Sequence, residues 1–343
     1  MVEETAIPTL ADVAARAGVS TATVSRVLNS PDKVAPKTRE RVARAVADLG
    51  YSPNFGARVM AARQTKTIGA VIPTMENAIF AKGLQAFQEA LHEHGYTLLV
   101  ASTGYDAEVE DAQIRALVAR GADALLLIGH SRDRDLYDFL ARQEVPAVVT
   151  WAVRPDDASA VPSIGFDNRQ AMRELAGHVI GLGHRHLALI SAETAQNDRA
   201  AERRAGVRAA MADRGLLPDA LCYIETTYGF DEGAAAFAHV MVKRPRPTAV
   251  LCGNDVLAAG ALRQARAMGL DVPGEVSITG FDDIDLAQIL HPPLTTVRVP
   301  HRDMGRQAAL ALIGHLTGAA PLSSATLDTT IVLRDTLAPP GHT

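Results

Sequence analysis

The chain has 343 residues, of which 48% are hydrophobic and 21% charged, so it can bury a sizeable core and is too long for one ordinary domain. Residues 1–66 hold ten Lys/Arg against six Asp/Glu, whereas the remainder holds 24 against 33, and a basic module on an acidic body is typical of phosphate contact through one part only. The two cysteines lack metal spacing, no apolar run approaches a membrane span, and the N-terminus lacks a basic n-region and an apolar h-region. These features argue against a disulfide framework, a zinc site and a membrane protein, and they predict a cytoplasmic protein.

The segment from Thr9 to Asn29, TLADVAARAGVSTATVSRVLN, predicts two short helices around a tight turn. Thr9 is a good N-cap, and Gly18 lies where the chain leaves the first helix and can adopt a positive φ. The second helix is expected to start near Ser20. Its expected inner face is Val24, Val27 and Leu28.

The outward face of this second helix is suited to DNA. Short polar side chains followed by Arg26 fit the insertion of its N-terminal end into a major groove, although Ala22 could contact only a thymine methyl. The alternative is an amphipathic helical hairpin without such a role. The predicted DNA-contacting residues of the segment are Thr9, Ser20, Thr21, Ala22, Thr23, Ser25, Arg26 and Asn29.

Two further helices are expected near the N-terminus. Residues 36–49 place Val42 and Ala45 on one helix face, which completes a three-helix core. The other faces of this helix carry basic residues, among them Lys37. Residues 54–62 can form only a short helix, which needs a partner surface to be stable in water. We expect that segment to fold on binding.

From Thr67 onward, short β-branched or leucine-rich runs alternate with helical patterns. This alternation predicts parallel sheets covered by helices on both faces, with ligands at the carboxyl ends of the strands. The expected strands are 67–72, 96–101, 124–128, 147–150, 187–191, 248–251 and 276–279. The expected helices are 79–94, 107–120, 169–182, 200–214, 232–242, 255–268 and 302–316.

Several blocks resemble the lactose-repressor (LacI) family in order and spacing. TLADVAARAGVSTATVSRVLN, KTRERVARAVADLGYSPN and ARVMAARQTKTIG resemble its N-terminal region, and IGFDN, GHRHLALIS, VPGEVSITGFDD and PPLTTVRVP resemble its body. The resemblance implies a small all-α helix-turn-helix head and an α/β core of two doubly wound parallel-sheet subdomains, periplasmic-binding-protein-like, with the ligand between them. At the hinge the family usually has a leucine that wedges into the minor groove. This chain has Met60 there, and Asn54 is a further predicted DNA contact.

The expected domain boundaries follow from this organisation. The resemblance implies three crossovers, which we place near Pro162–Gly165, Pro292–Leu294 and Ala320–Ser324, where proline, glycine and serine interrupt the pattern. The expected domains are 1–52 for the head, 53–66 for the hinge helix and linker, 67–163 with 293–322 for the N-terminal core subdomain, and 164–292 with 323–343 for the C-terminal one.

The family's effector site is carried over where this chain matches it. Arg203 in ERRAG falls at the family's effector-binding arginine, and Trp151, the only tryptophan, could stack on a sugar face. The alternatives are that the aromatic residues are plain core and that Arg203 is an ordinary surface residue. The predicted effector-binding residues are Phe80, Trp151, Arg203, Asn254, Asp255 and Asp282.

The sequence offers little support for an enzyme. His178, His184 and His186 around GLGHRH favour a helix-terminating glycine with solvated histidines over a metal or phosphate loop. The pair Asp282-Asp283 has no matching nucleophile or ligand set elsewhere. No catalytic residue, cofactor or metal is predicted.

We therefore expect a ligand-responsive, homodimeric transcriptional regulator, more a repressor than an activator, which binds a pseudo-palindromic operator in double-stranded DNA. A sugar or sugar acid is the expected effector, and its action as inducer or corepressor stays open, as does a higher oligomer. The rival is a solute-binding protein whose N-terminal helices are incidental. The basic head and the missing secretion signal argue against that rival.

Overall fold

The computed structural model describes residues 8–29, 31–52, 64–76, 78–153 and 161–341. The chain divides into two compact units, Met1–Thr65 and Lys66–Thr343, which we call the head and the body. No helix in these described ranges is long and apolar enough to cross a bilayer.

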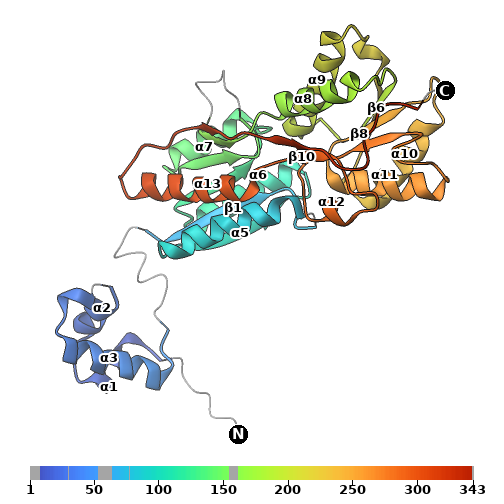
Figure 1. Cartoon of the computed structure of the whole chain (residues 1–343). Coiled ribbons are helices and arrows are strands. Elements are labelled where there is room, and N and C mark those ends of the chain that lie inside the picture. Colours follow the sequence, from blue (N-terminus) through green and yellow to red (C-terminus); the bar gives the residue numbers. More distant parts are fainter. Residues whose placement is uncertain (1–7, 30, 53–63, 77, 154–160, 342–343) are drawn as a thin grey trace. The chain divides into compact units, whose positions relative to one another are not determined.

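The head has the predicted three-helix arrangement (Figure 1). Its core is formed by small and β-branched side chains from all three helices, and Leu28 packs against it. The expected inner face of the second helix is therefore confirmed. The elements are α1 (Leu10–Ala17), α2 (Thr21–Asn29), the 3-10 turn η1 (Pro31–Lys33) and α3 (Pro36–Leu49). The buried core residues are Val13, Ala14, Ala17, Val24, Val27, Val42 and Ala45.

Local chemistry fixes both ends of α1. Thr9 and Asp12 form a capping box, in which the Thr9 amide donates to Asp12 Oδ2 at 2.8 Å and the Asp12 amide donates to Thr9 Oγ1 at 3.4 Å. Gly18 follows the helix with φ 63°, a conformation that a β-carbon would strain. The chain therefore turns at Gly18 and can start α2 at a fixed angle to α1.

The body contains two parallel sheets (Figure 1). In sheet A the strand order is β11-β5-β4-β3-β1-β2, and every neighbouring pair is parallel. Leu126 packs with α5 and α13 on one face, while Leu125 and Leu127 pack with α6 and α7 on the other, as expected of a sheet buried on both faces. The strands are β1 (Thr67–Ile72), β2 (Thr97–Ser102), β3 (Ala124–Ile128), β4 (Ala147–Thr150), β5 (Ser163–Gly165) and β11 (Ala325–Thr326). The helices are α5 (Ala78–Glu93), α6 (Ala107–Ala119), α7 (Arg134–Arg142) and α13 (His301–Leu316).

Sheet B has the order β7-β6-β8-β9 and is also parallel throughout. Leu187 and Leu189 of β6 pack with α8 and α9, whereas Ala188 and Ile190 pack with α10 and α11. The strands are β6 (Leu187–Ala192), β7 (Cys222–Thr226), β8 (Ala249–Cys252) and β9 (Ser277–Thr279). The helices are α8 (Asn168–Gly181), α9 (Asp198–Asp213), η2 (Pro218–Ala220), α10 (Phe230–Met241), α11 (Asp255–Ala267) and α12 (Leu286–Ile289). The predicted pair of doubly wound sheets is thus present.

A short antiparallel ribbon of β10 (Thr296–Arg298) and β12 (Thr330–Val332) joins the two halves of the body. The chain passes from sheet A to sheet B after β5, returns through β10 to α13, and leaves sheet A again after β11 through β12. Beyond β12 it pairs with sheet B, where the Ile278 amide donates to the Thr336 carbonyl at 2.9 Å.

Two of these passages lie later in the chain than the sequence boundaries at 163/164 and 322/323. Both β5 and β11 pair within sheet A, so residues 164–165 and 325–326 belong to the first half. The reason is strand length, because segments of two or three residues are too short to show a periodicity. The sequence also missed α7, whose buried Leu136 and Leu140 lie four residues apart, and the edge strand β7.

The helix pair α5 and α13 depends on a glycine contact. A β-carbon on Gly305 would fall inside contact distance of the carbonyl oxygen of Gly83, whereas one on Gly314 of the same helix would have Ala320 Cβ at 3.8 Å as its nearest neighbour. The two helices therefore approach at residue 305 and have free space at residue 314.

We expect Gly305→Ala to lower the free energy of unfolding of the body by about 1–3 kcal/mol, because overpacking forces the helices apart. Gly314→Ala is the control and should be neutral or stabilising by up to about 1 kcal/mol, since alanine favours the helix. Urea unfolding of the full chain compares the two. Equal effects would contradict the close approach.

Candidate functional site

Helix α2 presents an exposed face in the head. Thr21, Ala22 and Arg26 are exposed, as is Ser20 just before the helix. Ser20 Oγ accepts from the Thr23 amide at 3.2 Å and lies 2.9 Å from Thr23 Oγ1. Two of the predicted DNA contacts therefore cap α2 as well, and Arg26 is the charged residue of its outer face.

The remaining predicted DNA contacts divide into three groups. Thr9 is exposed, but its hydroxyl donates to Asp12 Oδ2 at 2.7 Å within the capping box. Ser25 is half-buried in α2. Asn54 and Met60 lie outside the described residues, as does the side chain of Asn29. The head surface also carries exposed basic residues on α3, namely Lys37, Arg41 and Arg44.

In the body, buried polar atoms collect at the carboxyl ends of three neighbouring strands of sheet B. Within the described ranges, Ser191 Oγ, Asn254 Nδ2, Thr279 Oγ1 and both carboxylate oxygens of Asp282 are buried without a hydrogen-bond partner. Ser191 belongs to β6, Asn254 follows β8, and Thr279 ends β9. Leaving a buried polar group unpaired costs about 1–3 kcal/mol. Their gathering at the carboxyl ends of parallel strands is typical of a ligand site.

Asp282 is the most perturbed of these groups. Burial raises the pKa of its carboxyl group to about 7, and the positive charges of Arg203 and Arg199 only partly oppose that effect. Its backbone has φ 108°, and that of Asp283 has φ 51°, conformations that non-glycine residues adopt rarely and that recur at functional sites. Neither pKa nor backbone strain is visible in the sequence.

Two ion pairs of Asp283 stabilise this turn. Its carboxylate accepts from Arg298 Nε at 2.7 Å and from an Arg334 amino group at 2.6 Å. Arg298 is in β10 and Arg334 follows β12, so the turn is tied to two of the three passages between the halves of the body. The carboxylate pair in the sequence therefore contains one unpartnered carboxylate and one fully engaged carboxylate.

Arg203 is buried beside this turn. Its Nε donates to Asn168 Oδ1 at 2.9 Å, a terminal nitrogen donates to the carbonyl of Gly253, and its guanidinium carbon lies 4.3 Å from the ring centroid of Phe281. Asn168, which the sequence analysis missed, also donates to the Trp151 carbonyl at 2.9 Å. Arg203 is thus no ordinary surface residue, because every described partner fixes it at the strand ends.

Asn254 and Asp255 differ in whether their polar side-chain atoms all have hydrogen-bond partners in the protein. Asn254 Oδ1 accepts from the Leu257 amide at 2.8 Å and so caps α11, while its amide nitrogen stays unpartnered. Asp255 accepts from Thr296 Oγ1 at 2.6 Å and from the Ile284 amide at 2.9 Å. Burial raises the pKa of Asp255 well above its usual value, with repulsion from Asp282 adding to the shift. Asp255 is therefore committed to protein partners.

Phe80 and Trp151 form one buried aromatic unit. Their rings meet edge to face with centroids 5.3 Å apart, and Trp151 Nε1 donates to His301 Nδ1 at 3.2 Å. Burial lowers the pKa of His301 to about 4, so the ring is neutral and can accept this bond. Only 1% of Trp151 is exposed, so in this structure Trp151 is a core residue.

The first half of the body faces the strand ends of sheet B through Tyr105 and the turn after β3. Tyr105 has φ 65° and packs against Tyr228, with ring centroids 5.7 Å apart. A cavity of about 190 Å³ lies beside this pair, and one of about 20 Å³ lies between Tyr105, Ser131 and Arg199. The smaller cavity holds about one water. A sugar-sized ligand that reaches Arg199 therefore requires the halves to move apart at that point.

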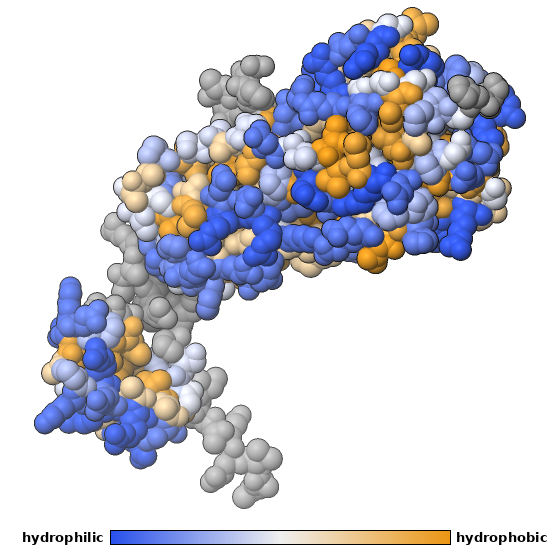
Figure 2. All heavy atoms as spheres, in the orientation of Figure 1, coloured by the Kyte–Doolittle hydropathy of each residue, from blue (hydrophilic) through white to orange (hydrophobic). Residues whose placement is uncertain are grey.

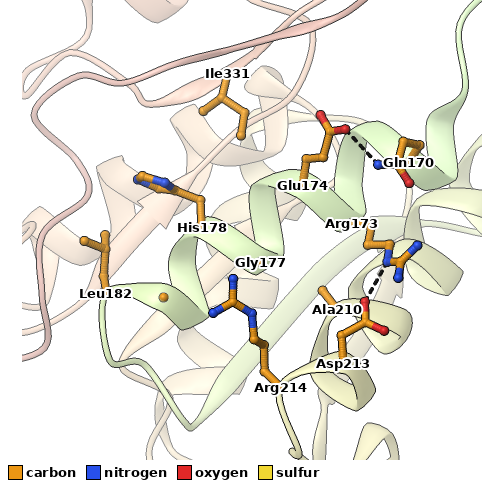
Figure 3. A pocket seen from close by; sticks show the side chains of 11 residues that line it. Gln170, Arg173, Glu174, Gly177, His178, Leu182, Ala210, Asp213, Arg214 and Ile331 are labelled. Carbon is orange, nitrogen blue, oxygen red and sulfur yellow. Dashed lines mark hydrogen bonds and ion pairs between the residues drawn. The ribbon is translucent and has the colours of Figure 1, made fainter.

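A larger hollow of about 690 Å³ lies elsewhere, along α8 and the end of α9 (Figure 3). It contains none of the predicted site residues, and two of its charged groups pair with each other: Arg173 Nε donates to Asp213 Oδ2 at 2.6 Å. His178 lines it, whereas His184 is buried, with its ring nitrogens 2.9 Å from Thr248 Oγ1 and 2.8 Å from the Ala338 carbonyl. The expectation that His184 is solvated was wrong, because it anchors the C-terminal segment.

Polar and apolar residues share the displayed surface of the body (Figure 2). Figure 2 shows hydrophilic residues over much of the displayed face of the body, with hydrophobic groups between them. Exposed large apolar side chains include Ile289, Leu217 and Val242, with 78%, 76% and 67% of their surface accessible.

Comparisons with known proteins agree with this arrangement. Residues 9–54 match the family described as bacterial regulatory proteins, lacI family, and residues 176–337 match the periplasmic binding protein-like domain. The HTH-type transcriptional regulator GntR of Escherichia coli (strain K12) is 30% identical over 311 residues, covering 91% of this chain and 92% of GntR.

Two solved structures are similar over nearly the whole chain. The lac repressor dimer bound to operator and the anti-inducer ONPF is 29% identical, with a TM-score of 0.83 over 96% of this chain and 99% of its own. The transcriptional regulator CelR–cellobiose complex is 31% identical, with a TM-score of 0.70 over 96% of this chain and 99% of its own.

The pKa of Asp282 makes stability depend on pH. The unfolded chain releases this proton near its usual pKa of 3.8, whereas the folded chain retains it to about pH 7, so this group's contribution to stability is lost as pH rises through that window. We expect Asp282→Asn to stabilise the body more at pH 8 than at pH 5, by on the order of a few kcal/mol. Urea unfolding at both pH values measures this. Asp328→Asn, at an exposed aspartate, is the control variant. If Asp282→Asn raises the free energy of unfolding equally at both pH values, the burial argument is contradicted.

Proposed function

The chain belongs to the lacI family of bacterial regulatory proteins, and we propose that α2 reads its operator while the strand ends of sheet B bind its effector. It is a ligand-responsive, DNA-binding transcriptional regulator and not an enzyme. Members of the family function as dimers. We assign it to the cytoplasm, where its DNA is, and to repression of genes for carbohydrate or sugar-acid metabolism.

The proposed reading surface is the exposed face of α2. Thr21, Ala22 and Arg26 are accessible on one helix, which is the geometry that a major groove admits. Ser20 and Thr23 start the helix, so their contribution is to orient it and to contact phosphate. Thr9, Ser25 and Asn29 complete the proposed contact set.

The hinge contacts are proposed from the sequence. Met60 takes the position of the minor-groove wedge, and Asn54 precedes it at the start of the same segment. An apolar side chain that enters a base step bends the duplex toward the protein. Two such hinges in a dimer fit the centre of a pseudo-palindromic operator.

The observation that carries the effector proposal is the group of unpartnered polar atoms at the carboxyl ends of β6, β8 and β9. A polyhydroxylated ligand supplies the missing partners, since its hydroxyl groups both donate and accept. We assign Asp282, Asn254 and Arg203 to ligand contact. Phe80 and Trp151 form the apolar wall, and Asp255 supports the start of α11. The cellobiose bound by CelR supports a sugar as the ligand class.

Effector binding is proposed to act by moving the two halves of the body. The passages between them carry Arg298 and Arg334, which bind Asp283 next to the effector site. A ligand that binds one spacing of the halves better than another shifts the population toward it. In a dimer this change alters the distance between the two heads.

Arg26→Ala and Lys37→Ala should separate base reading from phosphate contact. We expect Arg26→Ala to lose about 1–3 kcal/mol of discrimination between operator and altered sites, because its bidentate contact with guanine is lost. Lys37→Ala should weaken binding to all sequences alike and reduce the slope of log affinity against log salt by about one. Gel shifts with the DNA flanking the gene, at two salt concentrations, measure both. Unchanged discrimination in Arg26→Ala would remove it from the reading set.

Thr279→Val tests the effector site without removing a charge. Valine has the shape of threonine but lacks the hydroxyl, so the variant should be as stable as the wild type or more so. Its affinity for a sugar or sugar-acid effector found by calorimetric screening should fall about five- to tenfold, since one hydrogen bond is worth about 1 kcal/mol. Thr330→Val, on the exposed ribbon strand, is the matched control. Unchanged effector affinity in Thr279→Val would move the site away from β9.

A further inference from the structure

A second arginine, Arg199, stands beside the proposed effector site and was not among the predicted residues. It lies one helical turn before Arg203 on α9, so both side chains leave the same face of the helix. Only 6% of Arg199 is exposed. The positive charges of both arginines act on the buried carboxylate of Asp282.

The guanidinium of Arg199 is only loosely satisfied by the protein. In the part of the chain that the structure describes, its one hydrogen-bond acceptor is Oδ1 of the adjacent Asp198, at 3.3 Å. Its side chain also borders the cavity of about 20 Å³ between the two halves of the body. An arginine carries five N–H donors in a planar fork suited to a carboxylate. Most of that capacity is unused here.

Asp198 spans the cleft at the same point. Its Oδ2 accepts from the His130 amide at 2.6 Å, and its own amide donates to Ser131 Oγ at 3.0 Å. Both of these partners follow β3 in the opposite half of the body. A β-carbon on Gly129 would clash with the guanidinium of Arg199 and the carboxylate of Asp198, so the turn is shaped to admit this pair.

The turn that receives Asp198 is itself rigid. Arg132 donates to the carbonyls of Gly129 and Ile128, the latter at 2.9 Å, and to Glu110 Oε1 at 2.6 Å. The Arg132 side chain is 2% exposed. The buried ion pair of Arg132 and Glu110 therefore fixes the turn in which the His130 amide donates to the carboxylate of Asp198.

The charges around the cleft leave room for one more anion. Arg132 has Glu110 as its counter-ion, and Arg199 has Asp198. Among the described residues, Arg203 hydrogen-bonds only to neutral acceptors, Asn168 Oδ1 and the Gly253 carbonyl. Asp282 is nearby, but no hydrogen bond joins its carboxylate to either arginine. Arg203 is thus a buried cation without a bonded counter-ion one helical turn from Arg199, and its positive charge favours a ligand that brings a negative charge to the neighbouring guanidinium of Arg199.

We propose that Arg199 anchors the carboxylate of an acidic effector, a small polyhydroxy acid, and that Asp198 holds this position as an internal counter-ion until the effector replaces it. The hydroxyl groups of the acid donate to Asp282, while its carboxylate takes the guanidinium of Arg199. Because Asp198 also binds the turn at 129–131, its release couples the charge of the ligand to the spacing of the two halves. This inference rests on the proposed effector function of the cleft.

Calorimetric titration of the full-length protein tests the proposal with matched pairs of probes. D-gluconate is compared with D-glucitol, D-glucuronate with D-glucose, and D-galacturonate with D-galactose, since the members of each pair differ only in the carboxylate. We expect at least one acid to bind at least about tenfold more tightly than its neutral counterpart, as a charge-assisted contact allows.

Three variants then assign the anchor. Arg199→Gln should lower the affinity for that acid about ten- to hundredfold and leave the neutral sugar within about twofold, because only the charge-assisted contact is lost. Arg199→Lys should keep part of the preference. Asp198→Asn should raise the affinity for the acid about two- to fivefold, the range of a weak ion pair. Arg208→Gln on the same helix, whose partner is the exposed Asp219, is the control and should change neither affinity.

Each contrary result is distinct. This inference would be overturned if neutral sugars bind as tightly as the acids, or if no acid binds while operator binding is intact. It would also be overturned by an unchanged acid affinity in Arg199→Gln or by a lower acid affinity in Asp198→Asn. Each of these results leaves the regulator function standing. Absence of sequence-specific DNA binding by the wild type would instead overturn the proposed function. Operator binding by each variant, together with its thermal unfolding midpoint, shows that the fold is retained.

Discussion

The two ion pairs of Asp283 are the interaction on which the body depends. They connect the turn after β9 with Arg298 and Arg334, which lie on the two ribbon segments that join the halves. The carboxylate is buried, both of its oxygens are engaged in charge-assisted bonds, and Arg334 is largely buried with it, whereas Arg298 is exposed. They keep two successive residues at positive φ, and this strained turn holds the carboxylate of Asp282 without a protein partner. The effector site and the joint between the halves are thus one structure.

The cleft contains buried polar atoms that lack hydrogen-bond partners, and it has little free space beside Arg199. Ser191, Asn254, Thr279 and Asp282 leave polar atoms buried and unpaired, yet the cavity beside Arg199 has a volume of only about 20 Å³. Asp198 bridges the halves at its edge. A ligand that supplies partners to these atoms recovers their desolvation cost only when the halves have separated enough to admit it. Binding energy is therefore linked directly to a change in spacing, which is what a ligand-controlled regulator requires.

The head is organised by local rules rather than by the body. The Thr9–Asp12 capping box, Gly18 at positive φ, and the cap of α2 by Ser20 each act within a few residues. They set the direction of α2 through local contacts, and the small core that includes Val13, Val24 and Val42 holds the helices together. A module built this way can present the same reading face whatever the effector does to the body.

The sequence by itself determined the helix-turn-helix, the alternation of strands and helices, and the place of Arg203 on a helix and of Asp282 after a strand, because caps, turns and periodicity are local signals. It could not place β5 and β11 in the first sheet, since strands of two or three residues carry no pattern and are defined by their neighbours. The buried state of His184, the commitment of Asp255 to protein partners, and the meeting of Asp198 with His130 were decided by tertiary structure alone. Each depends on residues at least 29 positions apart, and burial, which sets their charge and their partners, exists only once those distant segments have packed together.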